Sequence, residues 1–126
     1  MGLDQTAYVT NYDPESGEKE ILREFSWRKH AKLQQYMLDL YSADHPNSTW
    51  EDFNSGEKLH LTRENIVNLK KLVEESRLPF CPAGFFWGHQ FQEESQKDYE
   101  EQDLEFCNIA LEMLDKGHDV IYECWW

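Results

Sequence analysis

The chain has 126 residues, of which 40% are hydrophobic and 14% aromatic, so it can form one compact domain with a single core. Twelve Lys and Arg against 25 Asp and Glu give a formal net charge of −13, and this excess repels the phosphates of nucleic acids and anionic lipid surfaces. We therefore expect a single domain over residues 1–126 that binds neither nucleic acid nor a membrane directly.

The amino-terminal sequence MGLDQTAYVT lacks a basic start followed by an apolar run, and no apolar stretch of the chain approaches membrane-spanning length. A soluble, cytoplasmic protein is therefore expected. The three cysteines, Cys81, Cys107 and Cys124, are widely spaced and form no CxxC pair. This pattern favours reduced, buried thiols over a disulfide framework or a zinc site.

The first third of the sequence predicts a β-hairpin followed by a helix. Residues 3–12 and 18–27 are β-prone, and the cluster Asp13-Pro14-Glu15-Ser16-Gly17 between them suits a tight reversal. From Trp27 to about Ser42, apolar residues recur every three or four positions, as on one face of a helix. These apolar residues are Leu33, Tyr36, Met37, Leu40 and Tyr41.

The rest of the chain predicts two further helices and two strands. Residues 58–61 alternate briefly as in a strand, and Thr62 is a candidate N-cap for a helix over about 63–76. The longest helix should run from about Gln92 to Lys116, with Gly117 ending it before the closing strand DVIYECWW. Because βαβ alternation is absent, we expect an α+β fold with a small, mainly antiparallel sheet packed against about three helices.

A first candidate site lies at the predicted start of the first helix. Its residues are Arg28, Lys29, His30 and Lys32. Cations in a first helical turn are disfavoured by roughly 0.3–1 kcal/mol each, because the free N–H groups already make that end positive. A bound phosphate or carboxylate would compensate, so these residues are a candidate anion-binding site. The alternative is that they are solvated, or paired with Glu20, Glu24 or Asp4 of the neighbouring hairpin.

A second candidate is the segment LPFCPAGFFWGHQFQEE, residues 78–94, in which prolines and glycines bracket adjacent aromatic residues. The structural interpretation is that it is a stiff connector whose aromatic side chains fill the core. The functional interpretation is that one exposed flank lines a groove for a partner, with Trp87 and His89 as candidate partner-binding residues.

A third candidate is the acidic start of the longest helix, where one lysine, Lys97, stands against seven acids. The acids are Glu93, Glu94, Asp98, Glu100, Glu101, Asp103 and Glu105. Like charges at helical spacing destabilise a helix by a few tenths of a kcal/mol per pair. A rigid acidic helix can imitate the phosphate track of DNA and occupy the basic groove of a nucleic-acid-handling protein. The alternative is a solvated face that only aids solubility.

Catalysis has little support in the sequence. It contains no P-loop, GxGxxG, HExxH or nucleophile-elbow pattern, and its histidines are dispersed. His89 and Glu93 have a four-residue spacing that suits a shared metal on a helix, but two ligands do not make a site. We therefore assign no catalytic residue, no cofactor and no metal, and we expect a protein that is not an enzyme.

Four stretches of the sequence stand out together. They are Met1-Gly2-Leu3-Asp4, Trp27-Arg28-Lys29, LTRENI at 61–66, and Leu78-Pro79 with Gly84-Phe85-Phe86-Trp87-Gly88. They resemble a family of small, mostly uncharacterised bacteriophage-encoded proteins, some of which carry a phosphoglycerate kinase label that the size and motifs of this chain do not support. The chain departs from the family pattern at Gln5, His30 and Trp87. The resemblance implies a phage origin and a location in the host cytoplasm, but no mechanism.

Three functions remain open at this point. The first is a small acidic phage protein that binds a host protein, with a DNA-mimicking helix blocking a nucleic-acid-handling factor. The second is a small anion- or nucleotide-binding enzyme or sensor that uses Arg28, Lys29 and His30. The third is a virion or assembly component. The sequence does not set the oligomeric state.

Overall fold

An antiparallel four-stranded sheet and three helices make up the computed structural model, which describes residues 3–12, 19–53, 57–82 and 92–125. The strands are β1 (Asp4–Tyr12), β2 (Lys19–Arg28), β3 (Leu59–Leu61) and β4 (Asp119–Trp125). The helices are α1 (Ala31–Asp44), α2 (Arg63–Glu74) and α3 (Gln92–Asp115), with a short 3-10 helix η1 (Trp50–Phe53) after α1. This is the α+β architecture that the sequence predicts.

The sheet has the strand order β2-β1-β4-β3, and every neighbouring pair is antiparallel. β1 and β2 form the predicted hairpin, with Ala7 opposite Phe25, while the predicted reversal at 13–17 lies outside the described residues. The final strand, β4, enters the middle of the sheet, where Tyr8 faces Ile121 across the β1–β4 pair and Leu59 faces Tyr122 across the β3–β4 pair.

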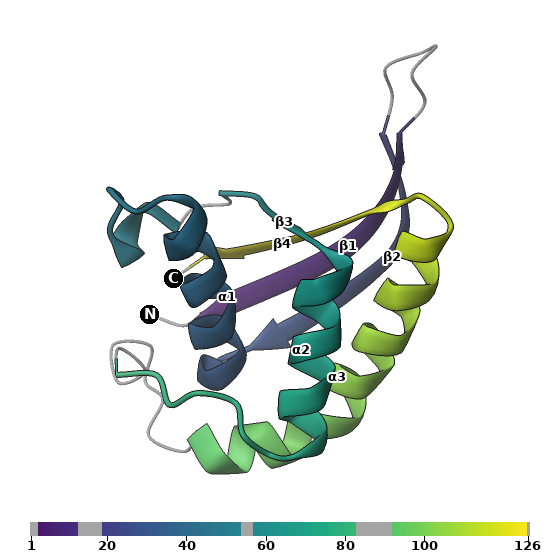
Figure 1. Ribbon diagram of the computed structural model, residues 1–126. Coiled ribbons are helices and arrows are strands. Elements are labelled where there is room, and N and C mark those ends of the chain that lie inside the picture. Colours follow the sequence, from purple (N-terminus) through teal and green to yellow (C-terminus); the bar gives the residue numbers. More distant parts are fainter. Residues whose placement is uncertain (1–2, 13–18, 54–56, 83–91, 126) are drawn as a thin grey trace.

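The three helices lie on one face of the sheet, and the core fills the space between the two layers (Figure 1). Side chains alternate along a strand, so one set from each strand points toward the helices. The inward set includes Ala7, Val9, Phe25, Trp27, Val120 and Tyr122, all buried, and they pack with Leu33, Met37, Ile66, Leu69 and Phe106 of the helices. The same alternation places Tyr8 and Ile121 on the opposite face, outside this core cluster.

The ends of the helices follow from local chemistry. Thr62 caps α2, because its hydroxyl accepts a hydrogen bond from the Asn65 backbone N–H at 3.1 Å and the Asn65 side chain accepts one from the Thr62 N–H at 2.9 Å. Gly117 follows α3 with φ of +88°, a conformation that favours glycine, as predicted for the end of that helix.

The predicted start of the first helix is wrong. β2 continues through Arg28, and α1 begins only at Ala31. Between them Lys29 has φ of +57°, a left-handed conformation that ends the strand and turns the chain into the helix. The basic residues therefore lie at the end of a strand and at the helix N-cap, His30, rather than in a first helical turn.

The cysteines are buried thiols, as the sequence predicts. Burial raises the pKa of Cys107 and of Cys124 to about 12 in each case. No helix in the described ranges combines the length and the apolar composition needed to cross a membrane.

Candidate functional site

The four residues of the predicted anion site do not form a cluster of uncompensated cations. Arg28 Nε lies 3.8 Å from Asp4 Oδ1 at the surface. His30 is fully buried, and Lys32 is only 5% exposed, with its Nζ 2.6 Å from Glu93 Oε1. Since carboxylates already lie beside these groups, an incoming anion would meet little net positive charge. The anion-site interpretation is therefore corrected for Arg28, His30 and Lys32, each of which has a carboxylate within 4 Å, while Lys29 has no ion pair among the described residues.

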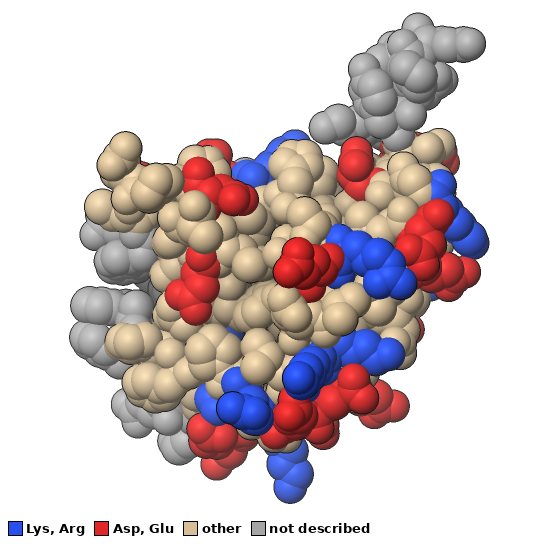
Figure 2. Space-filling model, in the orientation of Figure 1, with Lys and Arg blue, Asp and Glu red and all other residues tan. Residues whose placement is uncertain are grey.

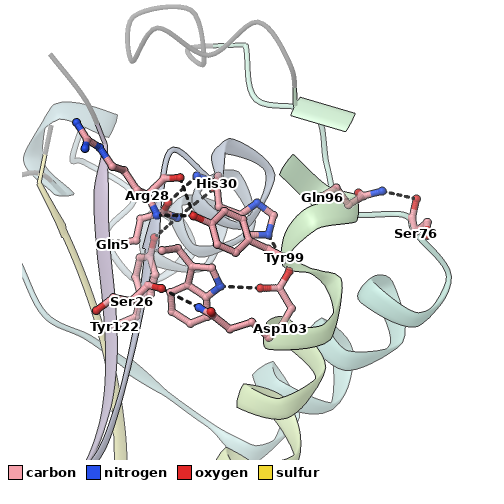
Figure 3. A network of polar contacts seen from close by, with 11 residues as sticks. Gln5, Ser26, Arg28, His30, Ser76, Gln96, Tyr99, Asp103 and Tyr122 are labelled. Carbon is pink, nitrogen blue, oxygen red and sulfur yellow. Dashed lines mark hydrogen bonds and ion pairs between the residues drawn. The ribbon is translucent and has the colours of Figure 1, made fainter. Parts of the chain in front are cut away.

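A buried carboxylate lies at the centre of this region. Asp103 is 1% exposed, and its two oxygens accept hydrogen bonds from Trp27 Nε1 at 2.8 Å and His30 Nε2 at 2.7 Å (Figure 3). The Tyr99 ring stacks on the imidazole with centroids 5.1 Å apart. Asp103 was predicted to contact a partner, but its position in the interior excludes that role, which is a second correction.

The carboxylate also sets the tautomer of His30. An ionised Asp accepts hydrogen bonds and cannot donate one, so the shared proton lies on Nε2 in the neutral ring. Nδ1 is then unprotonated, and among the described residues it is buried without a hydrogen-bond partner. The ring is thus held by one strong bond and one stacking contact.

Hydrogen bonds continue from His30 into the sheet. The Gln5 side chain accepts from the His30 backbone N–H at 2.8 Å and donates to the His30 carbonyl at 3.1 Å and to the Tyr122 hydroxyl at 2.9 Å. Tyr122 donates in turn to Gln34 Oε1 on α1. Burial raises the pKa of Tyr122 well above its usual value, so the hydroxyl remains a donor. We call Gln5, Trp27, His30, Gln34, Asp103 and Tyr122 the buried network.

The amino-terminal half of α3 is held mainly by polar side chains. Gln92 exchanges two hydrogen bonds with the Cys81 backbone, at 2.8 and 2.9 Å, and Gln102 donates to the Ser26 carbonyl at 2.7 Å. The Tyr99 hydroxyl bonds the Arg28 backbone, and Gln96 donates to the Ser76 carbonyl at 3.4 Å (Figure 3). The carboxyl-terminal half is instead anchored by apolar burial of Phe106, Cys107 and Ala110.

The opposite side of α3 carries a line of exposed carboxylates at spacings of three, four and seven residues. We call it the acidic stripe, and it consists of Glu94, Asp98, Glu101, Glu105 and Glu112. Glu105 lies 3.7 Å from Arg23, and Glu112 lies 3.1 Å from Lys116. Among the described residues Glu94, Asp98 and Glu101 have no ion-pair partner within 4 Å. With the exposed Lys97 among them, this end of the stripe has a net charge of −2.

The other predicted contact residues have mixed outcomes. Glu93 is exposed but pairs with Lys32, and Glu100 is half-buried. Trp87 and His89 lie outside the described residues. Before them, Leu78 and Cys81 are buried, as expected for a connector that feeds the core, while Phe80 is 67% exposed.

Acidic residues do not cover the molecule evenly. In the view of Figure 2, which faces the helical layer, Lys and Arg side chains are interspersed with Asp and Glu. Within the described part of the chain, no three His, Cys, Asp or Glu residues are grouped as a metal site would require. The stripe on α3 is one place where exposed acids outnumber the cations beside them.

Comparison with protein-family models, with curated proteins and with solved structures finds no match to this chain. The proposals that follow are supported by the geometry described above.

Proposed function

We propose that this chain is a binding protein that docks the acidic stripe of α3 into the basic groove of a protein partner. The proposed partner is a nucleic-acid-handling protein, and it is a host protein if the chain has the phage origin that its sequence resemblance implies. The observation that carries the proposal is the row of three exposed acids, Glu94, Asp98 and Glu101, which form no ion pair within the described residues and outnumber the one cation among them, Lys97.

The stripe places like charges beside one another on α3, although Glu94 in the first turn is favoured by the helix dipole and Lys97 attracts Glu94 and Glu101. Glu94 and Asp98, Asp98 and Glu101, and Glu101 and Glu105 are like-charge neighbours at three- or four-residue spacing. Each such pair destabilises a helix by about 0.2–0.5 kcal/mol. A cationic surface placed against the stripe would offset this repulsion, so the arrangement favours the bound state over the free state.

The stripe also has a suitable length. From Glu94 to Glu112 a helix rises about 27 Å, and its unpaired end from Glu94 to Glu101 rises about 10 Å, comparable with about three base pairs of duplex DNA. A negative rod of this size can enter a groove that otherwise holds nucleic acid, and long-range attraction speeds the encounter.

The inner face of α3 prepares the stripe for binding. Hydrogen bonds depend on direction, and those made by Gln92, Gln102 and Asp103 fix the rotation of the helix about its own axis. The carboxylates of the stripe then face outward before a partner arrives. Pre-ordering of this kind lowers the entropy lost on association.

The test compares two triple variants with the same change in charge. E94Q/D98N/E101Q removes the unpaired end of the stripe, whereas E20Q/D44N/E57Q neutralises three exposed acids on other elements. Immobilised wild-type chain should capture a partner from bacterial lysate at ~50 mM salt and release it at ~500 mM salt or on addition of duplex DNA. The control variant should behave like wild type, and the stripe variant should capture nothing.

Stability provides a second readout. The stripe variant should unfold with a free energy within about 1 kcal/mol of wild type, because the loss of like-charge repulsion is offset by the loss of the favourable interactions of Glu94 with the helix dipole and of Glu94 and Glu101 with Lys97. A partner that the stripe variant retains, or that high salt and DNA leave bound, would overturn the proposal. If both variants became less soluble and neither lost a partner, the acidic stripe would serve only to keep the protein in solution.

A further inference from the structure

The face of the sheet that the helices leave uncovered carries a hollow of about 370 Å³. Tyr8 and Thr10 of β1 line it, with Ile21 and Glu24 of β2, Glu123 of β4, and Lys58 next to β3. We call it the sheet hollow. Its volume lies in the range of pockets that hold small molecules, about 300–1,000 Å³.

The charges in the sheet hollow form no ion pairs within the described residues. Within the described ranges Glu24, Lys58 and Glu123 form no ion pair, although all three line one hollow. By contrast, Arg23 and Arg28 on β2 each have a carboxylate within 4 Å, Glu105 and Asp4 respectively. The charged groups of the hollow are therefore available to a ligand.

The hydroxyl groups of the hollow are also poorly satisfied. Thr10 is 2% exposed, and in the described part of the chain its Oγ1 has no hydrogen-bond partner. The Tyr8 hydroxyl donates to Glu123 Oε2 over a long 3.4 Å. Burial raises the pKa of Tyr8, and the nearby carboxylates of Glu123 and Glu24 raise it further. A buried hydroxyl without a partner is unfavourable by roughly 1–3 kcal/mol, which a ligand with donors would recover.

The order of the charges across the sheet indicates the ligand. Glu24 of β2 lies opposite Tyr8 on one side of β1, and Glu123 of β4 contacts the Tyr8 hydroxyl from the other side. Because β1 lies between β2 and β4, the axes of these two strands are about 10 Å apart. Leu59 lies opposite Tyr122 in the antiparallel β3–β4 pair, so the preceding residue, Lys58, lies beside Glu123, on the side of β4 away from β1. The order is thus negative, negative, positive from β2 to β3.

We propose that the sheet hollow binds a free basic α-amino acid, arginine or lysine. Its carboxylate meets Lys58, its α-ammonium meets Glu123, and its side-chain cation reaches Glu24 past the Tyr8 ring. The ligand has a net charge of +1 against −1 for the three lining residues, so the filled hollow is neutral. The site lies on the face opposite the helices, and it is independent of the proposed role of the acidic stripe.

The test is calorimetric titration of the full chain with L-arginine and L-lysine, followed by amide NMR shifts. Saturable binding below about 10 mM, with shifts in β1, β2 and β4, is the expected result. Glu24→Gln and Lys58→Met should each weaken arginine binding more than ~10-fold, because each removes one ionic contact. Glu20→Gln, an exposed neighbour on β2 that does not line the hollow, is the matched control and should change affinity less than ~2-fold.

Ligand analogues check which group meets which residue. Argininamide lacks the carboxylate, so its weaker binding should no longer fall when Lys58 is replaced by methionine. Nα-acetylarginine lacks the α-ammonium, and its binding should become insensitive to Glu123→Gln. Absence of saturable binding by both amino acids, or affinities that Glu24→Gln and Lys58→Met leave unchanged while the chain remains folded by circular dichroism, would overturn the proposal.

Discussion

Replacing Asp103 with alanine tests whether the buried network holds α3 to the sheet. The substitution removes the acceptor for two buried donors, Trp27 Nε1 and His30 Nε2. An unsatisfied buried donor costs roughly 1–3 kcal/mol, so the free energy of unfolding should fall by roughly 2–6 kcal/mol. A domain of this size has a total of about 5–15 kcal/mol, so the variant should be close to its limit of stability.

Asp103→Asn should be milder, for a reason specific to this site. The amide oxygen can still accept from Trp27, and the amide N–H₂ can donate to His30 if the imidazole proton moves from Nε2 to Nδ1. The variant therefore keeps both contacts at the expense of a change in tautomer. We expect it to lose about half of what Asp103→Ala loses, because the proton on Nδ1 becomes one buried donor without an acceptor, where Asp103→Ala leaves two.

Two measurements check these expectations. Urea unfolding followed by far-UV circular dichroism and tryptophan fluorescence gives the stabilities, with Glu101→Ala on the exposed side of α3 as the matched control, expected within about 0.5 kcal/mol of wild type. Nitrogen-15 NMR of the histidine rings reports the tautomer directly. The wild type should show the proton of His30 on Nε2, and Asp103→Asn should show it on Nδ1.

Equal free energies of unfolding for Asp103→Ala and Glu101→Ala would show that the hydrogen bonds of Asp103 do not stabilise the fold. A wild-type imidazole that carries its proton on Nδ1 would contradict them as well, since Asp103 would then lack the donor that its geometry requires. Either result would mean that apolar packing alone positions α3.

Three further predictions follow from described contacts. Lys32→Met should change stability by less than about 1 kcal/mol in urea unfolding, because it leaves Glu93 solvated at 79% side-chain exposure. Thr62→Ala should lower the melting temperature by a few degrees in calorimetry, since it removes an N-cap that contributes about 1 kcal/mol. Cys107 and Cys124 should resist alkylation at pH 8 in the native state. Their folded pKa of about 12 exceeds the usual 9, so the stability they contribute is complete below pH 9 and should fall as the pH rises toward 12.

Local patterns predicted the elements well, because caps and periodicity act over a few neighbouring residues. The helix over 63–76 was predicted from Thr62 and an apolar stripe, and α2 spans Arg63–Glu74. The longest helix was predicted over about Gln92 to Lys116, and α3 spans Gln92–Asp115. The start of α1 was missed because Lys29 adopts a left-handed conformation that its residue type does not signal.

The candidate sites were predicted less well, because pairing between distant segments decides which charges remain at the surface. Asp103 was grouped with the exposed acids by composition alone. Its position three, four and seven residues before Phe106, Cys107 and Ala110 places it on the buried face of α3. That spacing was visible in the sequence. Its partner His30, 73 residues away, was not, since the contact exists only after the helix crosses the end of β2.

The place of β4 in the sheet has a consequence for biosynthesis. β3 hydrogen-bonds only to β4 in the described sheet, and β1 has β4 as its second neighbour. A nascent chain can close the β1–β2 hairpin early, but β3 has no strand to join until residues 119–125 have been translated. Until then one edge of β1 is open to any other strand, so the growing polypeptide is vulnerable to aggregation until β4 has been made.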